Sequence, residues 1–269
     1  MRIPVGDLTF DAREYGDREN RPALLLHGFP ETGASWDDVA ARLADAGRYV
    51  VAPDQRGYSP DARPDGIEAY RIEELVADVV GMLDSLGIDA VDLVGHDWGA
   101  IVAWHVAAWH PRRVRSLTAV SVPHPGAFGW ALRNDADQKE RSEYMQLFRQ
   151  PDKAEDVLLA DDARRLIAMF SGAADPTIVE RHLPVVGDRA ALTGALNWYR
   201  AMTREFGDLG PVTVPTTFVW GNDDTAIGRV AAERCAQHVE GPYEFVELGV
   251  SHWVPEDDPD RLADEILAR

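Results

Sequence analysis

The sequence predicts an α/β fold with a mostly parallel sheet and helices on both faces. Two observations support this prediction. Short apolar runs, each ending in a polar or turn-rich loop, recur along the chain as buried strands do. Helical patterns lie between them, so strands and helices alternate. With 269 residues the chain is long enough for one large domain of this kind, or for a core with a modest insertion.

The strands and helices are predicted in chain order from these patterns. Apolar residues from Ile72 to Leu86 recur at helical spacing, which is typical of a helix that packs one face on a sheet. Residues 100–109 are apolar nearly all round and stop before Pro111, which predicts a helix that is covered on both sides. Residues 8–12 are expected to add an edge strand. Buried strands are expected at residues 23–26, 49–53, 91–95, 116–122, 216–220 and 243–248.

The alternation stops between about residues 124 and 209. That stretch has helical patterns without a convincing strand, and it is entered through a turn rich in proline and glycine, Pro123-His124-Pro125-Gly126. We therefore expect a helical cap at residues 124–209, inserted into a core made of residues 1–123 and 210–269.

Composition and charge disfavour several classes of partner. The chain carries 27 basic and 46 acidic residues, and its formal net charge of −19 works against binding to nucleic acid or to an anionic membrane. No run reaches the roughly 18 apolar residues that a membrane-spanning helix needs, and the N-terminus lacks the apolar segment of a signal peptide. The one cysteine, Cys235, excludes an internal disulfide and fits a cytoplasmic location.

The most informative segment is Gly95-His96-Asp97-Trp98-Gly99, between a predicted strand and a predicted helix. The two glycines let the chain turn sharply, so that Asp97 stands above the sheet at the N-terminus of the helix. This is the pattern of the nucleophile elbow of serine hydrolases, G-x-S-x-G, with Asp in place of Ser. An Asp nucleophile gives an alkyl ester by displacement at carbon, whereas Ser attacks an acyl carbonyl. The segment therefore predicts a covalent ester on Asp97.

Such a nucleophile needs a base and an acid that orients the base. Asp223 and Asp224 follow the strand predicted at 216–220, and His252 follows the last predicted strand. Both loops belong to the edge of the sheet where ligands bind in open α/β folds. Asp97, Asp224 and His252 are therefore predicted to form a triad. Asp223 is the rival acid, and the G-x-x-D spacing favours Asp224.

A second loop is predicted to supply an oxyanion hole. His27-Gly28-Phe29-Pro30-Glu31 follows the strand predicted at 23–26. A tight loop there would direct the backbone N–H of Phe29 at the site, opposite that of Trp98. Two such donors would hold the negative oxygen that forms when water attacks the ester.

Together, HGFPE, GHDWG, the G-x-x-D acid and the C-terminal SHW resemble the α/β-hydrolase superfamily and, within it, the epoxide hydrolase branch close to the haloalkane dehalogenases. The resemblance covers nearly the whole chain. It implies an α/β-hydrolase fold with the cap between the sixth and seventh strands. It also implies that Asp97 opens a small hydrophobic epoxide and that water activated by His252 releases a vicinal diol. No cofactor or metal is implied.

The resemblance also assigns roles to residues of the cap. The segment 197–200 (NWYR) is similar to the motif that carries one of two ring-opening tyrosines, here Tyr199, and the segment 143–151 is a looser match to the one that carries the other, here Tyr144. Phenols suit this role because the leaving alkoxide needs acidic hydrogen-bond donors. The expected substrate contacts are Pro30, Phe148, Trp198 and Trp253.

Two alternative functions stay open. A haloalkane dehalogenase would use the same Asp97 but hold the halide with N–H donors, for which Trp98 and either Trp130 or Trp198 are candidates. A catalytically silent relative would only bind its ligand, although a complete triad argues against that. The oligomeric state, including a homodimer, is also left open. Metal-ligand spacing is lacking around the remaining histidines considered, His105, His110, His182 and His238.

Overall fold

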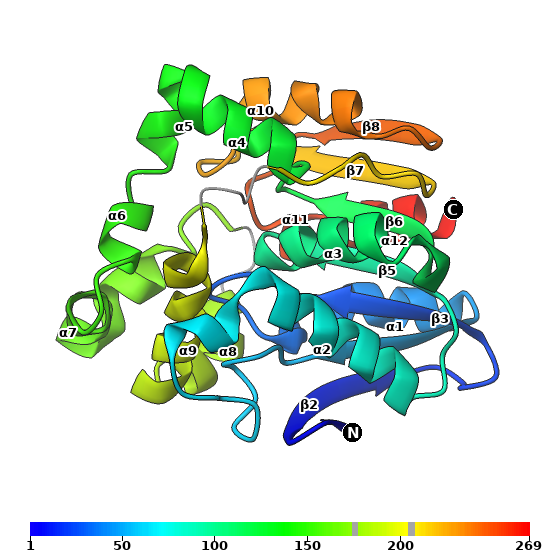
Figure 1. Ribbon diagram of the computed structural model, residues 1–269, viewed down its shortest axis with the longest axis horizontal. Coiled ribbons are helices and arrows are strands. Elements are labelled where there is room, and N and C mark those ends of the chain that lie inside the picture. The colour runs from blue at the N-terminus through cyan, green and yellow to red at the C-terminus, as the bar shows by residue number, and fades with distance from the viewer. Residues whose placement is uncertain (174–176, 204–207) are drawn as a thin grey trace.

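The computed structural model describes residues 1–173, 177–203 and 208–269. Within these residues the central element is an eight-stranded sheet in the order β1-β2-β4-β3-β5-β6-β7-β8 (Figure 1). All neighbouring pairs from β4 to β8 are parallel, whereas β1–β2 and β2–β4 are antiparallel. The predicted α/β fold with a mostly parallel sheet is confirmed. The strands are β1 (Arg2–Val5), β2 (Leu8–Tyr15), β3 (Arg21–Leu26), β4 (Arg48–Pro53), β5 (Val91–His96), β6 (Val114–Val120), β7 (Thr216–Gly221) and β8 (Tyr243–Leu248).

The prediction of an edge strand at residues 8–12 is wrong. β2 extends to Tyr15 and pairs on both sides, with β1 and with β4. β1 takes the edge, where Pro4 is tolerated because an edge strand leaves one side without a partner. The turn between β1 and β2 uses Gly6 at a φ of +57°, a conformation that glycine adopts at little cost. A Gly-Asp pair between two short apolar runs is a hairpin signal that points to this turn.

Alternating side chains of the strands form a hydrophobic core on each face of the sheet. Along β3, Leu24 and Leu26 enter the core on one face, and Ala23 and Leu25 enter the core on the other. Burial of one such leucine contributes about 2 kcal/mol. A shift of the strand by one residue would therefore exchange the two sets and is strongly disfavoured.

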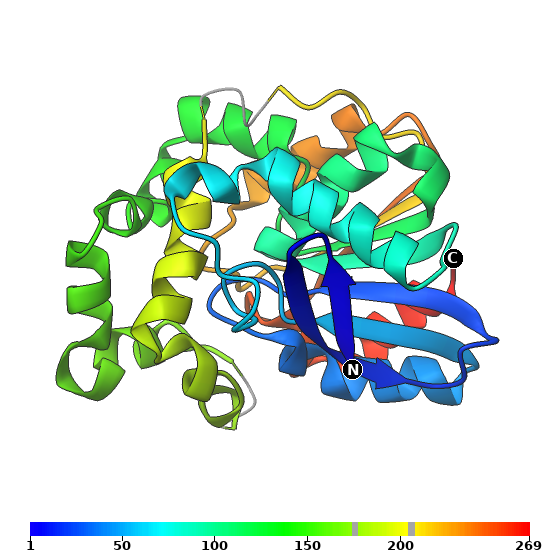
Figure 2. The same ribbon diagram turned by 60° about the horizontal axis from the view of Figure 1, so that its bottom comes forward.

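Helices cover both faces, as Figure 2 shows. The helix predicted from Ile72 matches α2, and α3 begins directly after Asp97. Residues Trp98–Ala107 of α3 are all buried, as the apolar pattern predicts, but Trp109 at the end of the predicted range is 44% exposed. The helices are α2 (Ile72–Ser85) and α3 (Trp98–Trp109) on one face, and α1 (Asp37–Asp45) and α12 (Pro259–Leu267) on the other.

The elements that the structure describes between β6 and β7 are helices joined by turns and loops, and several of these helices lie beside one end of the sheet (Figure 1). A buried ion pair of 2.8 Å between Glu155 and Arg200 joins α7 to α9. The predicted cap range 124–209 stays a prediction, and it includes residues 174–176 and 204–207, which lie outside the described residues. The helices are α4 (Pro125–Asn134), α5 (Ala136–Arg141), α6 (Met145–Phe148), α7 (Lys153–Ala168), α8 (Ile178–Val186) and α9 (Arg189–Ala201).

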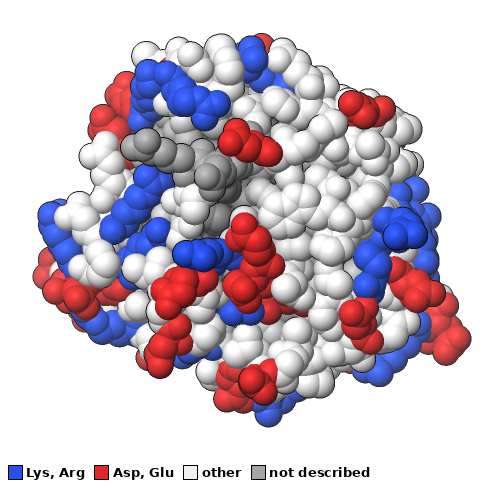
Figure 3. All heavy atoms as spheres, viewed as in Figure 1, with Lys and Arg blue, Asp and Glu red and all other residues white. Residues whose placement is uncertain are grey.

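The surface carries charges of both signs. On the face in Figure 3, basic side chains lie next to acidic ones, and ion pairs such as Arg141–Asp137 and Arg189–Asp156, both at 2.7 Å, join them. Within the described ranges, no helix has the length and apolar character needed to cross a bilayer.

Candidate active site

Asp97 occupies the sharp turn between β5 and α3. Its φ of +50° lies in the left-handed region, which is unfavourable for a residue with a side chain. The backbone packs tightly around this turn: a Cβ on Gly95 would lie 2.2 Å from the carbonyl oxygen of Gly99, and one on Gly99 would lie 2.1 Å from that of Leu26. The two glycines therefore permit the close packing that holds Asp97 in this strained conformation, which is a common feature of functional residues.

The two carboxylate oxygens of Asp97 have different surroundings. The backbone N–H of Phe29 donates to Oδ1 at 2.8 Å. Oδ2 lies 3.5 Å from Nε2 of His252. Asp97 is only 7% exposed. One oxygen is thus held by a backbone donor while the other is presented to the histidine.

His252 is held on its other side by Asp224. Nδ1 of His252 donates to Oδ2 of Asp224 at 2.7 Å, and Oδ1 of Asp224 accepts the N–H groups of Ala226 and Ile227 at 2.6 and 2.9 Å. Asp224 is buried, whereas Asp223 is exposed to solvent. Between the two candidate acids, the hydrogen bond to His252 is therefore made by Asp224.

The two carboxylates raise the pKa of His252. Burial alone lowers it, but the charge and hydrogen bond of Asp224, together with those of Asp97, outweigh burial and raise the pKa well above its ordinary value. The resting site therefore favours a protonated His252 between two anionic carboxylates.

Phe29 and Trp98 flank the nucleophile from two different elements. Phe29 belongs to the loop after β3 and already donates its N–H to Asp97 Oδ1. Trp98 is the first residue of α3, where the helix dipole favours negative charge. Both are therefore placed where an oxyanion hole would need them.

Two tyrosines face Asp97 from the predicted cap. Tyr199 comes from α9 and is 3% exposed, whereas Tyr144 directly precedes α6 and is 36% exposed. Their rings lie edge-on to each other with centroids 6.3 Å apart. Tyr199 packs its ring edge-on against Phe29 and Trp98, at centroid distances of 5.5 and 5.0 Å. The two phenols therefore form a pair beside the nucleophile.

Burial raises the pKa of both phenols. The negative charge of Asp97 raises it further for Tyr199 and for Tyr144, while a hydrogen bond from Trp98 opposes the rise for Tyr199. Both groups are therefore neutral donors at neutral pH. A negatively charged oxygen between them would accept their protons as hydrogen bonds.

Asp97, His252 and both tyrosines line one cavity of about 340 Å³. Of the predicted substrate contacts, Phe148 and Trp253 line this cavity. Among the described residues, Pro30 and Trp198 are not part of its wall. The other lining residues include the apolar side chains of Leu147, Leu158 and Met169 and the polar ones of Arg141, Ser171 and Thr225.

The indoles proposed as halide ligands have other partners. Trp98 packs edge-on against the ring of Tyr199 and is not among the described residues that line the cavity. The indole N–H of Trp198 donates to the carbonyl oxygen of Arg56 at 3.0 Å. The guanidinium of Arg234 lies over the ring of Trp130 at 3.7 Å, and Trp130 is not among the described residues that line the cavity. A pair of indole donors aimed into the cavity is therefore not formed here.

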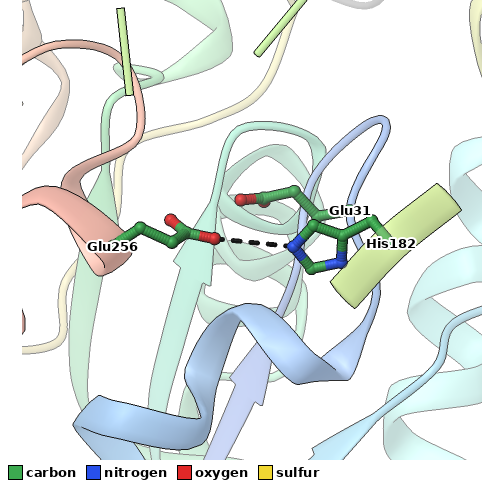
Figure 4. Close-up of side chains that lie close together, drawn as sticks. All are labelled: Glu31, His182 and Glu256. Carbon is green, nitrogen blue, oxygen red and sulfur yellow. Dashed lines mark ion pairs between the residues drawn. The ribbon is translucent and has the colours of Figure 1, made fainter. Parts of the chain in front are cut away.

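Sequence reasoning gave no role to a buried polar cluster behind the site. Glu31, His182 and Glu256 come from three separate segments, and one potential ligand atom from each lies within 4.8 Å of the others (Figure 4). His182 was expected only as a surface or core residue and is fully buried. Arg141 was also missed: it donates to the carbonyl oxygen of Asp224 at 2.6 Å. No local pattern marks these residues, because their partners are distant in sequence.

Comparisons with known proteins agree with this architecture. A family model described as alpha/beta hydrolase fold matches residues 22–259. The chain is 34% identical over 266 residues to the AB hydrolase superfamily protein YfhM of Bacillus subtilis, covering 96% of this chain and 92% of that protein. It is 34% identical over 298 residues to Epoxide hydrolase A of Mycobacterium tuberculosis, covering 94% and 91%. The crystal structure of Epoxide Hydrolase A from Mycobacterium thermoresistibile superposes with a TM-score of 0.86 at 30% identity, covering 100% of this chain and 96% of that one.

Proposed function

The chain belongs to the alpha/beta hydrolase family and is a hydrolase, and from this premise we propose that it converts an epoxide to a vicinal diol through an alkyl ester on Asp97. The observation that carries the proposal is one cavity in which a carboxylate at an elbow is paired with two neutral phenols. The relatives named epoxide hydrolases support it. The apolar walls favour a small hydrophobic epoxide.

In the first step, Oδ2 of Asp97 attacks one ring carbon from the side opposite the epoxide oxygen. The carbon–oxygen bond of the ring breaks, and its electron pair stays on the oxygen. Tyr144 and Tyr199 hydrogen-bond to this oxygen as it becomes an alkoxide, and one of the two phenols gives it its proton and is left as a phenolate. The product of the step is a hydroxyalkyl ester of Asp97.

In the second step, His252 removes a proton from a water molecule, which attacks Cγ of the ester. The negative charge develops on Oδ1, where Phe29 already donates its N–H and Trp98 would supply the second donor. The tetrahedral intermediate then collapses, the bond between Cγ and Oδ2 breaks, and the diol leaves with a proton from His252. The carboxyl group of Asp97 now contains one oxygen from water, and the second proton of that water passes from it to the phenolate, which restores the resting site.

The pKa of His252 should fall when the ester forms. Asp97 helps to raise that pKa in the resting site, and esterification removes the negative charge. Neutral His252 is thus favoured in the step that needs a base. The rate of ester hydrolysis should therefore rise with pH and reach its plateau at a pH below the pKa of His252 in the free enzyme. An NMR titration of His252 and the pH dependence of single-turnover ester hydrolysis would measure the two values. Equal values would contradict this role of the Asp97 charge.

Replacement of His252 by Gln should trap the ester. The Gln side chain cannot take a proton from water, so the first step proceeds and the second slows by on the order of 10³-fold or more. After the protein is mixed with an epoxide such as styrene oxide, intact-mass spectrometry should show a mass increase equal to one substrate molecule. Peptide mapping should locate this addition on Asp97.

A single turnover of the wild-type enzyme in ¹⁸O-labelled water tests the same intermediate without a variant. The label should appear first in the Asp97 carboxylate and not in the diol. Label that enters the diol directly in the first turnover would show that water attacks the epoxide itself, and would reject the covalent mechanism.

The two alternative functions make different predictions from the same protein. A dehalogenase would release halide from haloalkanes without forming diol, but Trp98 and Trp198 are not among the described residues that line the cavity, and the indole N–H of Trp198 is bonded to Arg56. A silent relative would bind epoxide without a trapped ester in the His252→Gln protein. The hydrogen bond between His252 and Asp224 disfavours that reading, because simple binding does not need a water-activating pair.

A further inference from the structure

Behind the active site, three buried polar side chains converge from separate parts of the fold. Glu31 lies in the loop after β3, His182 lies on α8 and Glu256 lies on α11 (Val254–Asp257), just after His252. Figure 4 shows them pointing toward one another, and Glu256 Oε1 lies 3.7 Å from Nε2 of His182. Glu31 and His182 are fully buried, and Glu256 is 8% exposed.

The cluster is connected to the loop that carries Phe29. Oε2 of Glu31 accepts the N–H of Gly28 at 3.2 Å and lies 2.8 Å from Nδ1 of His96. Nδ1 of His182 accepts the N–H of Thr32 at 3.1 Å. Both ends of the loop segment 28–32 are therefore held by this cluster, and its middle supplies the N–H group that contacts Asp97.

Glu31 and Glu256 lie in one buried cluster, with a carboxylate oxygen of each within 4.8 Å of the other. Two buried acids this close favour a single shared proton, because two negative charges would repel each other there. Without that proton, three buried oxygens would lack a hydrogen-bond donor among the described residues: both oxygens of Glu256 and Oε1 of Glu31. The N–H of Gly28 and the ring of His96 stabilise a negative charge on Glu31, whereas Glu256 has no comparable donors among the described residues. The proton is therefore expected to reside on Glu256.

Electrostatics agree with this assignment. Burial raises the pKa of Glu256 well above its ordinary value, and the charge and hydrogen bond of Glu31 raise it further. Burial also acts to raise the pKa of Glu31, but the charge and hydrogen bond of His96 outweigh it and lower that pKa. The other titratable or charged groups that act on the cluster are His27 and Arg13 near β3 and β2, Arg181 and His182 on α8, and Asp257 on α11.

A bound cation explains the cluster less well than a shared proton does. A histidine that ligates a metal through Nε2 normally donates its Nδ1–H to an acceptor. Here Nδ1 of His182 accepts a backbone N–H, so in neutral His182 the proton is on Nε2 and points into the cluster. The nitrogen that a metal would need is therefore already protonated.

We propose that Glu31 and Glu256 share one proton and that this pair, together with His182, positions the loop of Phe29 in the active site. Glu256 and His182 are then positioning residues for the reaction, a conclusion that rests on the function proposed above. His182 also ties α8 of the predicted cap to this loop, so that the seating of the cap and the placement of the oxyanion donor depend on each other.

The shared proton is tested by Glu256→Gln, read as thermal unfolding between pH 5 and pH 9. Because Glu256 binds its proton more tightly in the folded protein than in the unfolded one, wild-type stability should fall as pH rises above the unfolded pKa of about 4.3. The Gln variant keeps a donor to Glu31 and loses this dependence. Its Tm should exceed that of the wild type by a margin that grows with pH, to about 3 °C or more at pH 8.

Glu180→Gln is the matched control, because Glu180 is an exposed carboxylate on α8. Its effect on Tm should not grow with pH. If the Tm difference between Glu256→Gln and the wild type were as independent of pH as that of Glu180→Gln, the shared proton would be overturned. Stoichiometric binding of Zn²⁺ or Mn²⁺ to the wild type, lost in Glu256→Gln, would also overturn it and identify a cation site instead.

The positioning role is tested by two variants of His182. Asn can place its oxygen where Nδ1 accepts the Thr32 N–H, whereas Gln reaches only toward the place of Nε2. His182→Gln should lower kcat roughly tenfold with KM nearly unchanged, because His182 is not in the described cavity wall. His182→Asn should keep most of kcat. Equal losses in both variants, or a change confined to KM, would contradict a positioning role.

Amide hydrogen exchange makes the test independent of turnover. Exchange at Phe29 and Thr32 should accelerate in His182→Gln and not in His182→Asn. This readout and the Tm series report on the cluster even if no epoxide is hydrolysed, and the ester trap reports on the reaction. Failure of one proposal can therefore be distinguished from failure of the other.

Discussion

Replacement of Asp97 by Asn is expected to abolish diol formation, with a loss on the order of 10⁴-fold or more in kcat. The amide oxygen is a poor nucleophile at carbon, and the rest of the site, including the hydrogen bond between His252 and Asp224, stays in place. Chiral gas chromatography of the diol formed from a panel of epoxides would measure the loss.

The same variant has a second expected effect that serves as its control. With the charge at position 97 removed, the pKa of His252 should fall, because that charge contributes to its rise. An NMR titration would detect this and would show that the site is folded. Deamidation back to Asp must be excluded by mass spectrometry. Full turnover by the intact Asp97→Asn protein would reject Asp97 as the nucleophile.

Replacement of Tyr199 by Phe is expected to slow ester formation by about 10²-fold, since loss of one donor to a developing oxyanion typically costs that much. The matched change Tyr144→Phe should also slow it, because Tyr144 lines the same cavity as Tyr199 and Asp97. The double variant should lose more than either single one. Rapid-quench measurement of ester formation in the His252→Gln background would isolate this step.

Ester hydrolysis supplies the internal control for the tyrosine variants. The phenols act on the epoxide oxygen and not on Cγ of Asp97, so the hydrolysis rate measured after ester formation should change little. If both steps slowed equally in Tyr199→Phe, the effect would reflect a disturbed cavity. Tyr199 packs against both Phe29 and Trp98, which makes this control necessary.

Much of the fold and part of the site could be predicted because their signals are local in sequence. The apolar run of β3 and the helical period of α2 report burial directly, since side chains alternate on strands and recur every three to four residues on helices. The elbow around Asp97 is also local: Gly95 and Gly99 are the residues whose missing Cβ atoms permit the turn. The order of strand, nucleophile and helix then placed Asp97 at the edge of the sheet.

Other features depend on packing between distant segments. Asp223 and Asp224 are adjacent and chemically identical, and only their burial and hydrogen bonds distinguish them: Asp224 contacts His252 while Asp223 faces solvent. The edge position of β1 likewise depends on the pairing of β2, which pairs with β1 on one side and with β4 on the other. The hydrogen-bond partner of Trp198, which weighs against a halide site, is the distant residue Arg56.

By itself, therefore, the sequence determined the class of fold, the elbow with Asp97 as its carboxylate, and the order of acid and histidine along the chain. The tertiary structure decided which acid meets His252, which aromatic residues line the cavity, and that Glu31, His182 and Glu256 come together. The physical reason is distance along the chain. Periodicity and turn motifs involve neighbouring residues, whereas Glu31 and Glu256 come together only because the fold buries two distant acids in one cluster.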